Sequence, residues 1–168
     1  MPHGELKIRT SQTSGWLDAY DVWGVSLDET GMSRLMTPAP NKQPVNNKSE
    51  LEHGKSVIYA PLNVMKDERT ISLVMHLTAN RHYSSSHGRW LTEREDFFIK
   101  YKDFCEKVLD AGYIEMATCY IPGVVYRLLY IDCTQFSEFM LGLAKFTLSL
   151  NEPNPYNRGI SHDDTSPF

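Results

Sequence analysis

The stretch RTISLVMHLTA, residues 69–79, is the clearest strand in the chain and limits the fold most strongly. Successive side chains of a strand point to opposite faces of its sheet. One face therefore receives only apolar side chains, those of Ile71, Leu73, Met75 and Leu77. The opposite face, with Ser72, Val74, His76 and Thr78, is mixed and could face solvent, a second layer or another subunit. The pattern predicts a sheet with one face against a hydrophobic core.

One strong helix is expected next, over residues 93–110. Thr92 followed by Glu95 is a capping box, in which each side chain bonds to the other residue's backbone N–H. Gly112 suits the left-handed position that ends a helix. Apolar side chains recur at helical spacing and predict one buried stripe, formed by Phe97, Tyr101, Phe104, Cys105 and Val108.

Further strands are expected on both sides of this helix, over residues 17–27, 113–121, 124–133 and 144–150. The turn dipeptide Pro122-Gly123 joins two of them into a hairpin. A tight hairpin would place Ile114 and Met116 on one face with Val125, Leu129 and Ile131. Pro-Gly favours a type II turn over the primed hairpin turns, so the register stays open. Residues 134–143 form either a bend or a continuation of the preceding strand.

The order of strands, one helix and strands predicts a mainly β (α+β) protein. We expect an antiparallel β-sandwich or partly closed barrel with one flanking helix. A single domain is predicted over residues 1–150, with a long arm loop at 28–55 and a polar C-terminal tail at 151–168. A loop as long as 28–55 is usually functional or binds a partner. Residues 56–64 are expected to be extended only in short pieces, because Pro61 donates no ladder hydrogen bond.

The charge balance excludes several classes of function. The chain has 168 residues and a formal net charge of −4, without the basic excess of a protein that grips nucleic acid by its phosphates. No apolar run is long enough for a membrane span, and the opening MPHGELKIRT has no secretion-signal pattern. Cys105, Cys119 and Cys133 lack C-x-x-C spacing, which predicts isolated thiols in a reducing cytoplasm.

Three of the six histidines, His76, His82 and His87, lie within twelve residues and raise the question of a metal site. Zinc ligands must all reach one ion at about 2.0–2.1 Å, which tight spacings such as H-x-x-x-H allow. Here the histidines span a strand end and a loop, and no HExxH or CxxC motif accompanies them. We therefore predict no metal site, although a metal-dependent enzyme using these three residues is the remote alternative.

Other catalytic chemistry has equally little support. The run Ser84-Ser85-Ser86 lies outside any G-x-S-x-G elbow, and no glycine-rich phosphate loop is present. The carboxylates of 67–70 and 93–98 fit a solvated turn and a helix N-terminus. One hairpin face could collect three tyrosines, with Arg127 on the other face: Tyr113, Tyr126 and Tyr130. We expect that face to serve packing or an interface, and we predict no catalytic, cofactor-binding or metal-binding residue.

The order of these motifs over roughly residues 17–158 resembles the N-terminal domain of the distal tail protein of long-tailed phages, which is related to the tail tube proteins. LDAYDVWGVSLDETGMSRLMTPAPNK is similar to the family's opening strand and its bend into a Pro- and Lys-containing loop. DERTISLVMHL is similar to its R-x-[apolar]-x-[apolar] strand, with Arg69 in place. KFTLSLNEPNPYNR is similar to its closing strand and exit. The Gly-Gly-like turn near Asn46-Asn47 and a second, carbohydrate-binding domain are missing.

The resemblance implies a structural protein without catalysis or cofactor. It implies a homo-hexameric ring around a DNA channel, made in the bacterial cytoplasm and built into the virion tail beside other tail proteins. It implies no membrane and no sequence-specific nucleic-acid binding. In such rings, residues 28–55 and 80–91 would be arms that reach neighbouring subunits. The alternative from another class is a β-domain that binds a small ligand or a protein.

Overall fold

The fold is mainly β, as predicted, in a computed structural model that describes residues 4–41, 66–137, 142–159 and 167–168. The elements in chain order are β1 (Leu6–Thr10), β2 (Leu17–Asp18), α1 (Ala19–Trp23), β3 (Val25–Leu27), α2 (Gly31–Met36), β4 (Arg69–Thr78), β5 (His82–Ser84), β6 (Arg89–Leu91), α3 (Glu93–Phe104), the π-helical turn η1 (Cys105–Leu109), β7 (Tyr113–Thr118), β8 (Val125–Ser137) and β9 (Leu143–Glu152).

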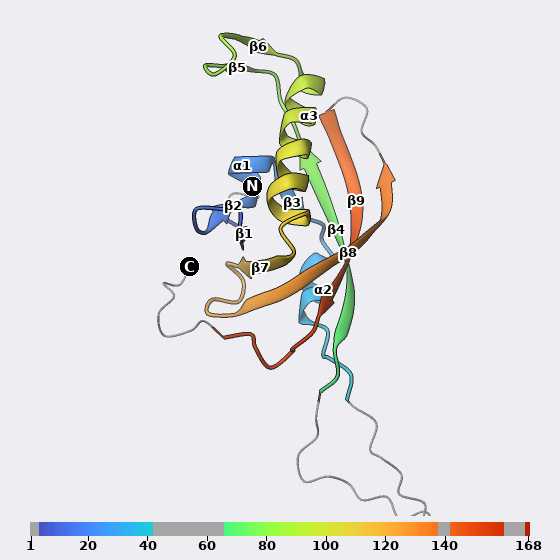
Figure 1. Cartoon of the computed structure of the whole chain (residues 1–168). Coiled ribbons are helices and arrows are strands. Elements are labelled where there is room, and N and C mark those ends of the chain that lie inside the picture. Colours follow the sequence, from blue (N-terminus) through green and yellow to red (C-terminus); the bar gives the residue numbers. More distant parts are fainter. Residues whose placement is uncertain (1–3, 42–65, 138–141, 160–166) are drawn as a thin grey trace, which may run out of the picture.

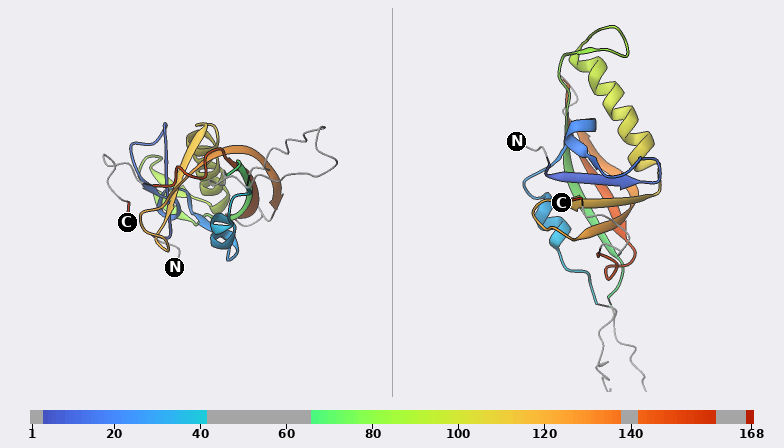
Figure 2. Two further views of the ribbon diagram at one scale, coloured as in Figure 1. Left: turned by 90° about the horizontal axis from the view of Figure 1, so that it is seen from below. Right: turned by 90° about the vertical axis from the view of Figure 1, so that its left-hand side faces the viewer.

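Seven strands form one antiparallel sheet in the order β2-β1-β7-β8-β9-β4-β3, and β5 pairs with β6 in a separate hairpin. The sheet is strongly bent, and no closed barrel forms. Figure 2 shows β1 and β7 running across the direction of β4 and β9, while the long strand β8 belongs to both halves. Helix α3 lies along the β4–β9 half, and the β5–β6 hairpin projects beyond the start of that helix (Figure 1).

The core lies between the bent sheet and α3. The predicted apolar face of β4 is confirmed, since Leu73 and Met75 are almost fully buried, and Leu148 of the neighbouring β9 is buried as well. Aromatic rings fill the space under the helix, where Phe104 contacts both Trp23 and Phe146 at centroid distances of 5.8 and 5.9 Å. Because these rings come from α1, α3 and β9, one core joins all three parts of the chain.

Helix α3 begins where the sequence predicts. The Thr92 side chain accepts from the Glu95 backbone N–H, and Glu95 accepts from the Thr92 backbone N–H, so the capping box is confirmed. Its last turn is a π-turn, because the Asp110 backbone N–H bonds to the carbonyl of Cys105. Gly112 follows with φ 83°, the left-handed conformation expected of it.

The prediction of one strand over 17–27 is wrong. Asp18 accepts hydrogen bonds from the backbone of Tyr20 and Asp21 at 3.0 and 3.1 Å and thereby starts α1. Gly24, at φ 67°, ends this short helix and leaves only residues 25–27 for β3. Capping chemistry therefore prevails over the β-forming side chains of this stretch. Strand β1, over 6–10, was not predicted at all.

The hairpin of β7 and β8 has a register that the sequence left open, and it differs from that of a tight hairpin. Ile114 lies opposite Leu128 and Met116 opposite Tyr126, so the shared buried face contains these even-numbered residues. Val125 pairs instead with Ala117, and Leu129 with Tyr113. The two strands stop short of the Pro122-Gly123 turn, at Thr118 and Val125, because the connection is longer than a tight hairpin turn.

The predicted arms have partly regular structure. The 28–55 loop contains helix α2, whose Leu35 is fully buried, and its residues 42–55 lie outside the described part, as do residues 56–64. The 80–91 loop is largely the β5–β6 hairpin. Strand β9 continues through Glu152, past the predicted domain boundary at 150, and the backbone N–H of Val125 bonds to the carbonyl of Arg158.

Candidate interaction surface

The second half of β8 offers an open backbone edge. Residues 130–137 pair with β9 on one side. On the other side, the pairing with β7 reaches only as far as Leu129, which lies opposite the first residue of β7, Tyr113. No strand of the described chain covers this side of 130–137. Figure 1 shows this part of β8 at the border of the sheet. The register shifts twice, which leaves Ile131 and Thr134 as extra residues in two bulges. Ile131 is 55% exposed. Bulges are typical of sheet edges and limit uncontrolled strand pairing there.

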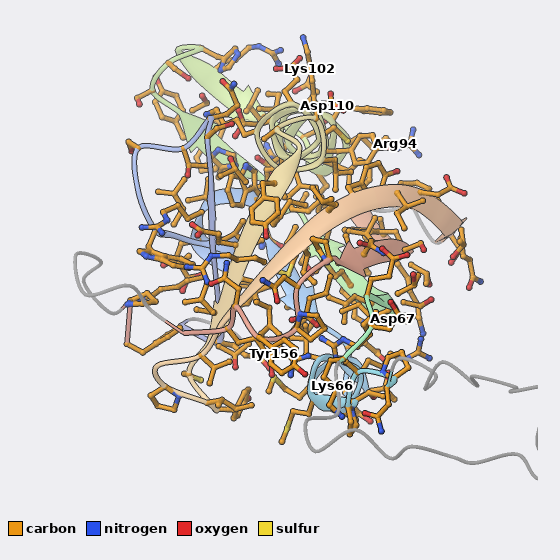
Figure 3. The ribbon with its side chains drawn as sticks, turned by 60° about the horizontal axis from the view of Figure 1, so that its bottom comes forward. Lys66, Asp67, Arg94, Lys102, Asp110 and Tyr156 are labelled. Atoms are coloured by element: carbon orange, nitrogen blue, oxygen red, sulfur yellow. The ribbon has the colours of Figure 1, made fainter. Side chains whose placement is uncertain are left out.

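A small cavity of about 150 Å³ lies between this edge and the helix. Its walls are mostly aromatic and apolar, formed by Tyr101, Phe104, Cys105, Leu109, Asp110, Tyr130, Cys133, Phe136, Phe146 and Leu148. Asp110, at the end of the helix (Figure 3), supplies the one carboxylate of the lining. Tyr101 and Phe136 connect helix and edge, with ring centroids 5.5 Å apart.

Burial raises the pKa of two polar groups of this cavity, Tyr101 and Cys105. Burial is the main reason that the pKa of Tyr101 rises to about 12. Burial also raises the pKa of the Cys105 thiol, although a hydrogen bond with Tyr101 acts in the opposite direction. Both groups therefore stay protonated near neutral pH, and a thiol needs a lowered pKa to act as a nucleophile. The cavity therefore presents a protonated phenol and a protonated thiol beside its aromatic walls.

The β5–β6 hairpin forms a second candidate surface, distant from the β8 edge along the chain. Tyr83 and Trp90 are 55% and 59% exposed, and their rings meet edge to face at 5.9 Å. The Arg81 guanidinium lies 5.6 Å from the Trp90 ring. Tyrosine, tryptophan and arginine are the residues most often found at the energetic centre of protein interfaces.

A broad depression of about 530 Å³ lies at the base of the hairpin. Its lining combines hairpin and helix residues, namely Arg81, Trp90, Leu91, Thr92, Glu93 and Arg94. Arg94 points outward from the start of α3 (Figure 3). An exposed ion pair between Arg89 and Glu95, at 2.9 Å, connects the hairpin to the helix. The hydrogen bond from the Thr92 backbone is the main cause that lowers the pKa of Glu95, and the Arg89 contact lowers it further.

The three clustered histidines do not converge. His76 Nε2 lies 2.8 Å from Asp28 Oδ1, whereas His82 Nδ1 lies 3.2 Å from the Asn80 carbonyl oxygen. His87 Nδ1 lies 2.9 Å from the hydroxyl of Ser84. Within the described residues, no group of three potential metal ligands gathers at one point.

The absence of a metal site remains a prediction with a direct test. We expect the purified protein to carry no stoichiometric zinc and to keep its melting temperature when EDTA is added. The three histidine rings bond to different neighbours, so they do not converge on one ion. Elemental analysis and thermal melts check this. One bound metal per chain, lost in the variant His82→Ala/His87→Ala, would instead support the enzyme alternative.

The other predicted clusters are also separated. Tyr113 lies on the face of β7 opposite to the one it was expected to share with Tyr126 and Tyr130, because Tyr113 pairs with Leu129 and Met116 with Tyr126. Tyr126 is buried, and burial raises the pKa of its phenol. The prediction of a three-tyrosine face is therefore wrong.

A buried ion cluster lies where β4 begins and β9 ends. Arg69 Nη2 lies 2.7 Å from Glu152 Oε2, and the two side chains are 3% and 1% exposed. Arg69 also donates to the carbonyl oxygens of Leu35, at 2.8 Å, and Thr37. Arg158 pairs with the same carboxylate at 2.7 Å. Two guanidinium groups therefore share one buried carboxylate, and this cluster fits a structural clamp on the end of β9.

Comparison with known proteins adds no family assignment. No protein-family model matches the chain, and neither the curated proteins nor the solved structures gave a match. Within the described residues, no helix has the length and apolar character to cross a membrane. The function is therefore inferred from the two candidate surfaces, the β8 edge at 130–137 and the β5–β6 hairpin.

Proposed function

We propose that the chain is a structural subunit of a phage or prophage tail, of distal tail or tail-tube type, that closes into a homo-hexameric ring around the DNA channel. It would be made in the bacterial cytoplasm, incorporated into the virion tail and placed beside other tail proteins. No catalysis and no cofactor belong to this role.

The observation that supports the ring most strongly is the presence of two unlike surfaces on one subunit. The hairpin with Tyr83 and Trp90 projects from the molecule (Figure 1), whereas the β8 edge at 130–137 is a strand edge beside an aromatic cavity. A contact between two different patches of identical subunits is heterologous, and repeating it produces a closed ring when the rotation closes.

The order of elements supports the phage-tail assignment. The R-x-[apolar]-x-[apolar] strand beginning at Arg69, the capped helix α3, the β7–β8 hairpin and the closing strand β9 follow one another as the resemblance implies. The net charge of −4 is also compatible with a channel wall past which DNA slides without being held.

Binding of a small ligand, the alternative from another class, has less support. The aromatic cavity of about 150 Å³ is smaller than the roughly 300–1,000 Å³ typical of small-molecule sites. The larger depression beside the hairpin lies open at the surface.

The test is assembly. Purified protein at high concentration, and protein co-expressed with the products of adjacent genes, should form rings of tail width in electron micrographs. Light scattering should give a mass about six times that of the 19.3 kDa subunit. A strict monomer under both conditions would contradict the proposal. Genes for a tape-measure protein and a tube protein beside the gene of this chain would support it.

A further inference from the structure

We infer that the β5–β6 hairpin of one copy docks on the β8 edge of a second copy, with the Tyr83 ring in the cavity beside that edge. This inference rests on the proposed ring and names the two segments that form its repeated contact. It is a heterologous contact, so each subunit uses its hairpin on one neighbour and its edge on the other.

The size of the cavity fits one six-membered aromatic ring. Its volume is about 150 Å³, and an apolar cavity of roughly this volume can hold benzene. Tyr83 presents such a ring with 55% of the residue exposed. The tyrosine hydroxyl also requires a polar partner once it is buried. Asp110, the carboxylate in the lining, can accept that hydrogen bond.

Charge favours the same pairing. Residues 80–91 contain Arg81 and Arg89 and no acidic residue, and Arg89 also pairs with Glu95 of α3. The β8 segment 130–137 contains Asp132 and no lysine or arginine. Complementary charges of this kind raise the association rate and exclude wrong registers. Two copies meeting hairpin to hairpin or edge to edge would instead bring like charges together.

The backbone of the β8 edge can add directional hydrogen bonds. Along 130–137, β9 occupies one side, and the described chain supplies no strand for the other. An extended segment from a partner can pair with such an edge through its main chain while its side chains enter adjacent pockets. The bulges at Ile131 and Thr134 interrupt regular pairing, so only a short partner segment fits. Strand β5, with three residues, is that short.

The native Cys133 makes the contact testable by cross-linking. We would place a cysteine at the exposed hairpin tip with Ser85→Cys, in a Cys119→Ser background that removes an exposed thiol. Mild oxidation of the assembled protein should give a ladder of covalent oligomers on a non-reducing gel. Mass spectrometry should identify residue 85 joined to Cys133. The ladder should disappear when Cys133→Ser is added, and Ser14→Cys, at another exposed turn, should give none.

Affinity supplies the second readout. Tyr83→Ala should weaken self-association on the order of tenfold or more, as expected for a central aromatic anchor, and Tyr83→Phe should weaken it less because the ring remains. Tyr120→Ala, at a tyrosine that is 61% exposed in the β7–β8 connection, is the matched control and should have no effect. Circular dichroism verifies that each variant is folded.

The outcomes separate this inference from the proposed function. Rings that form without a link to Cys133, and that tolerate Tyr83→Ala, would overturn the hairpin contact and leave the ring proposal standing. A protein that stays monomeric at high concentration and on co-expression would overturn both. The specific link, together with weaker assembly of Tyr83→Ala, supports the contact.

Discussion

Gly24 is the residue whose replacement should damage the fold most directly. Its φ is 67°, and a Cβ built on it would lie 2.1 Å from the carbonyl oxygen of Thr78. The two backbones also share a hydrogen bond from the Thr78 N–H to the Gly24 carbonyl, at 2.9 Å. Gly24→Ala should therefore lower the free energy of unfolding through both strained backbone and a clash that only a shift of β4 can relieve.

Gly88 provides the matched control for that prediction. It has a similar φ of 63°, but a Cβ there meets nothing within 4 Å. Gly88→Ala should cost only the left-handed conformation, about 1–2 kcal/mol, and Gly24→Ala clearly more in urea unfolding. Equal costs for the two variants would mean that the close approach to Thr78 does not constrain the fold.

The contact between Asp28 and His76 predicts a pH dependence. The hydrogen bond from His76 is the main cause that lowers the pKa of Asp28 below its usual 3.8. A carboxylate whose pKa is lower in the folded state stabilises the fold above its unfolded pKa, and this stabilisation is lost as the pH falls through the folded pKa. Asp28→Asn should therefore destabilise the protein near neutral pH.

The expected difference is small, because both side chains are partly exposed, at 37% for His76 and 23% for Asp28. We expect no more than about 1 kcal/mol at neutral pH. Urea unfolding of the two proteins at a series of pH values should show the curves converging below pH 3.8. A constant gap down to the lowest pH would show that the charge of Asp28 is not the cause.

At the scale of elements, α3 carries most of the packing that the sequence predicts. Thr92→Ala removes the N-terminal cap and should lower the free energy of unfolding by about 1 kcal/mol.

Phe104→Ala empties a fully buried site between Trp23 and Phe146 and should lower the free energy of unfolding by roughly 3–5 kcal/mol. An unchanged denaturant midpoint for Phe104→Ala would contradict this packing. Phe98→Ala, at a position 64% exposed, is the control with a small expected effect.

Elements with one dominant signal were predictable, and elements decided by competing signals were not. Strands β4 and β9 alternate strictly along one buried face, and α3 combines a capping box with a regular apolar stripe. Residues 17–27 contain good strand formers, yet Asp18 and Gly24 supply a cap and a stop that convert the middle into a helix. Local hydrogen bonds of this kind are hard to weigh against propensity from sequence alone.

The candidate surfaces were predictable only in part. The 80–91 segment was expected to be an arm, but its pairing as a hairpin was not foreseen, because its strands contain only three residues each. The β8 edge is open because β7 begins only opposite Leu129 and because two bulges interrupt β8. Neither the start of β7 nor the bulges could be predicted from the sequence pattern. The exposed pair Tyr83 and Trp90, separated by a glycine-containing turn, was the signal that could have revealed the hairpin.

At the scale of the whole molecule, the ion cluster around Arg69 connects parts of the chain that lie far apart in sequence. Arg69 starts β4, Glu152 ends β9, and Arg158 follows in the C-terminal segment. Near this cluster, the backbone N–H of Lys66 donates to the Tyr156 hydroxyl at 2.8 Å, and Figure 3 shows both residues at this end of the molecule. The cluster therefore holds the ends of two central strands and the C-terminal segment together.

Removing one charge of this cluster should destabilise the entire domain. Arg69→Met leaves the carbonyls of Leu35 and Thr37 without their donor and removes a partner from a carboxylate that is 1% exposed. Because Arg158 still pairs with Glu152, the cost comes mainly from the buried Leu35 carbonyl that loses its donor, about 1–3 kcal/mol. Arg89→Met breaks an ion pair whose side chains are 57% and 39% exposed and should lower the free energy of unfolding much less. Denaturant unfolding of both variants measures the contrast, and similar midpoints would show that Arg158 alone can balance Glu152.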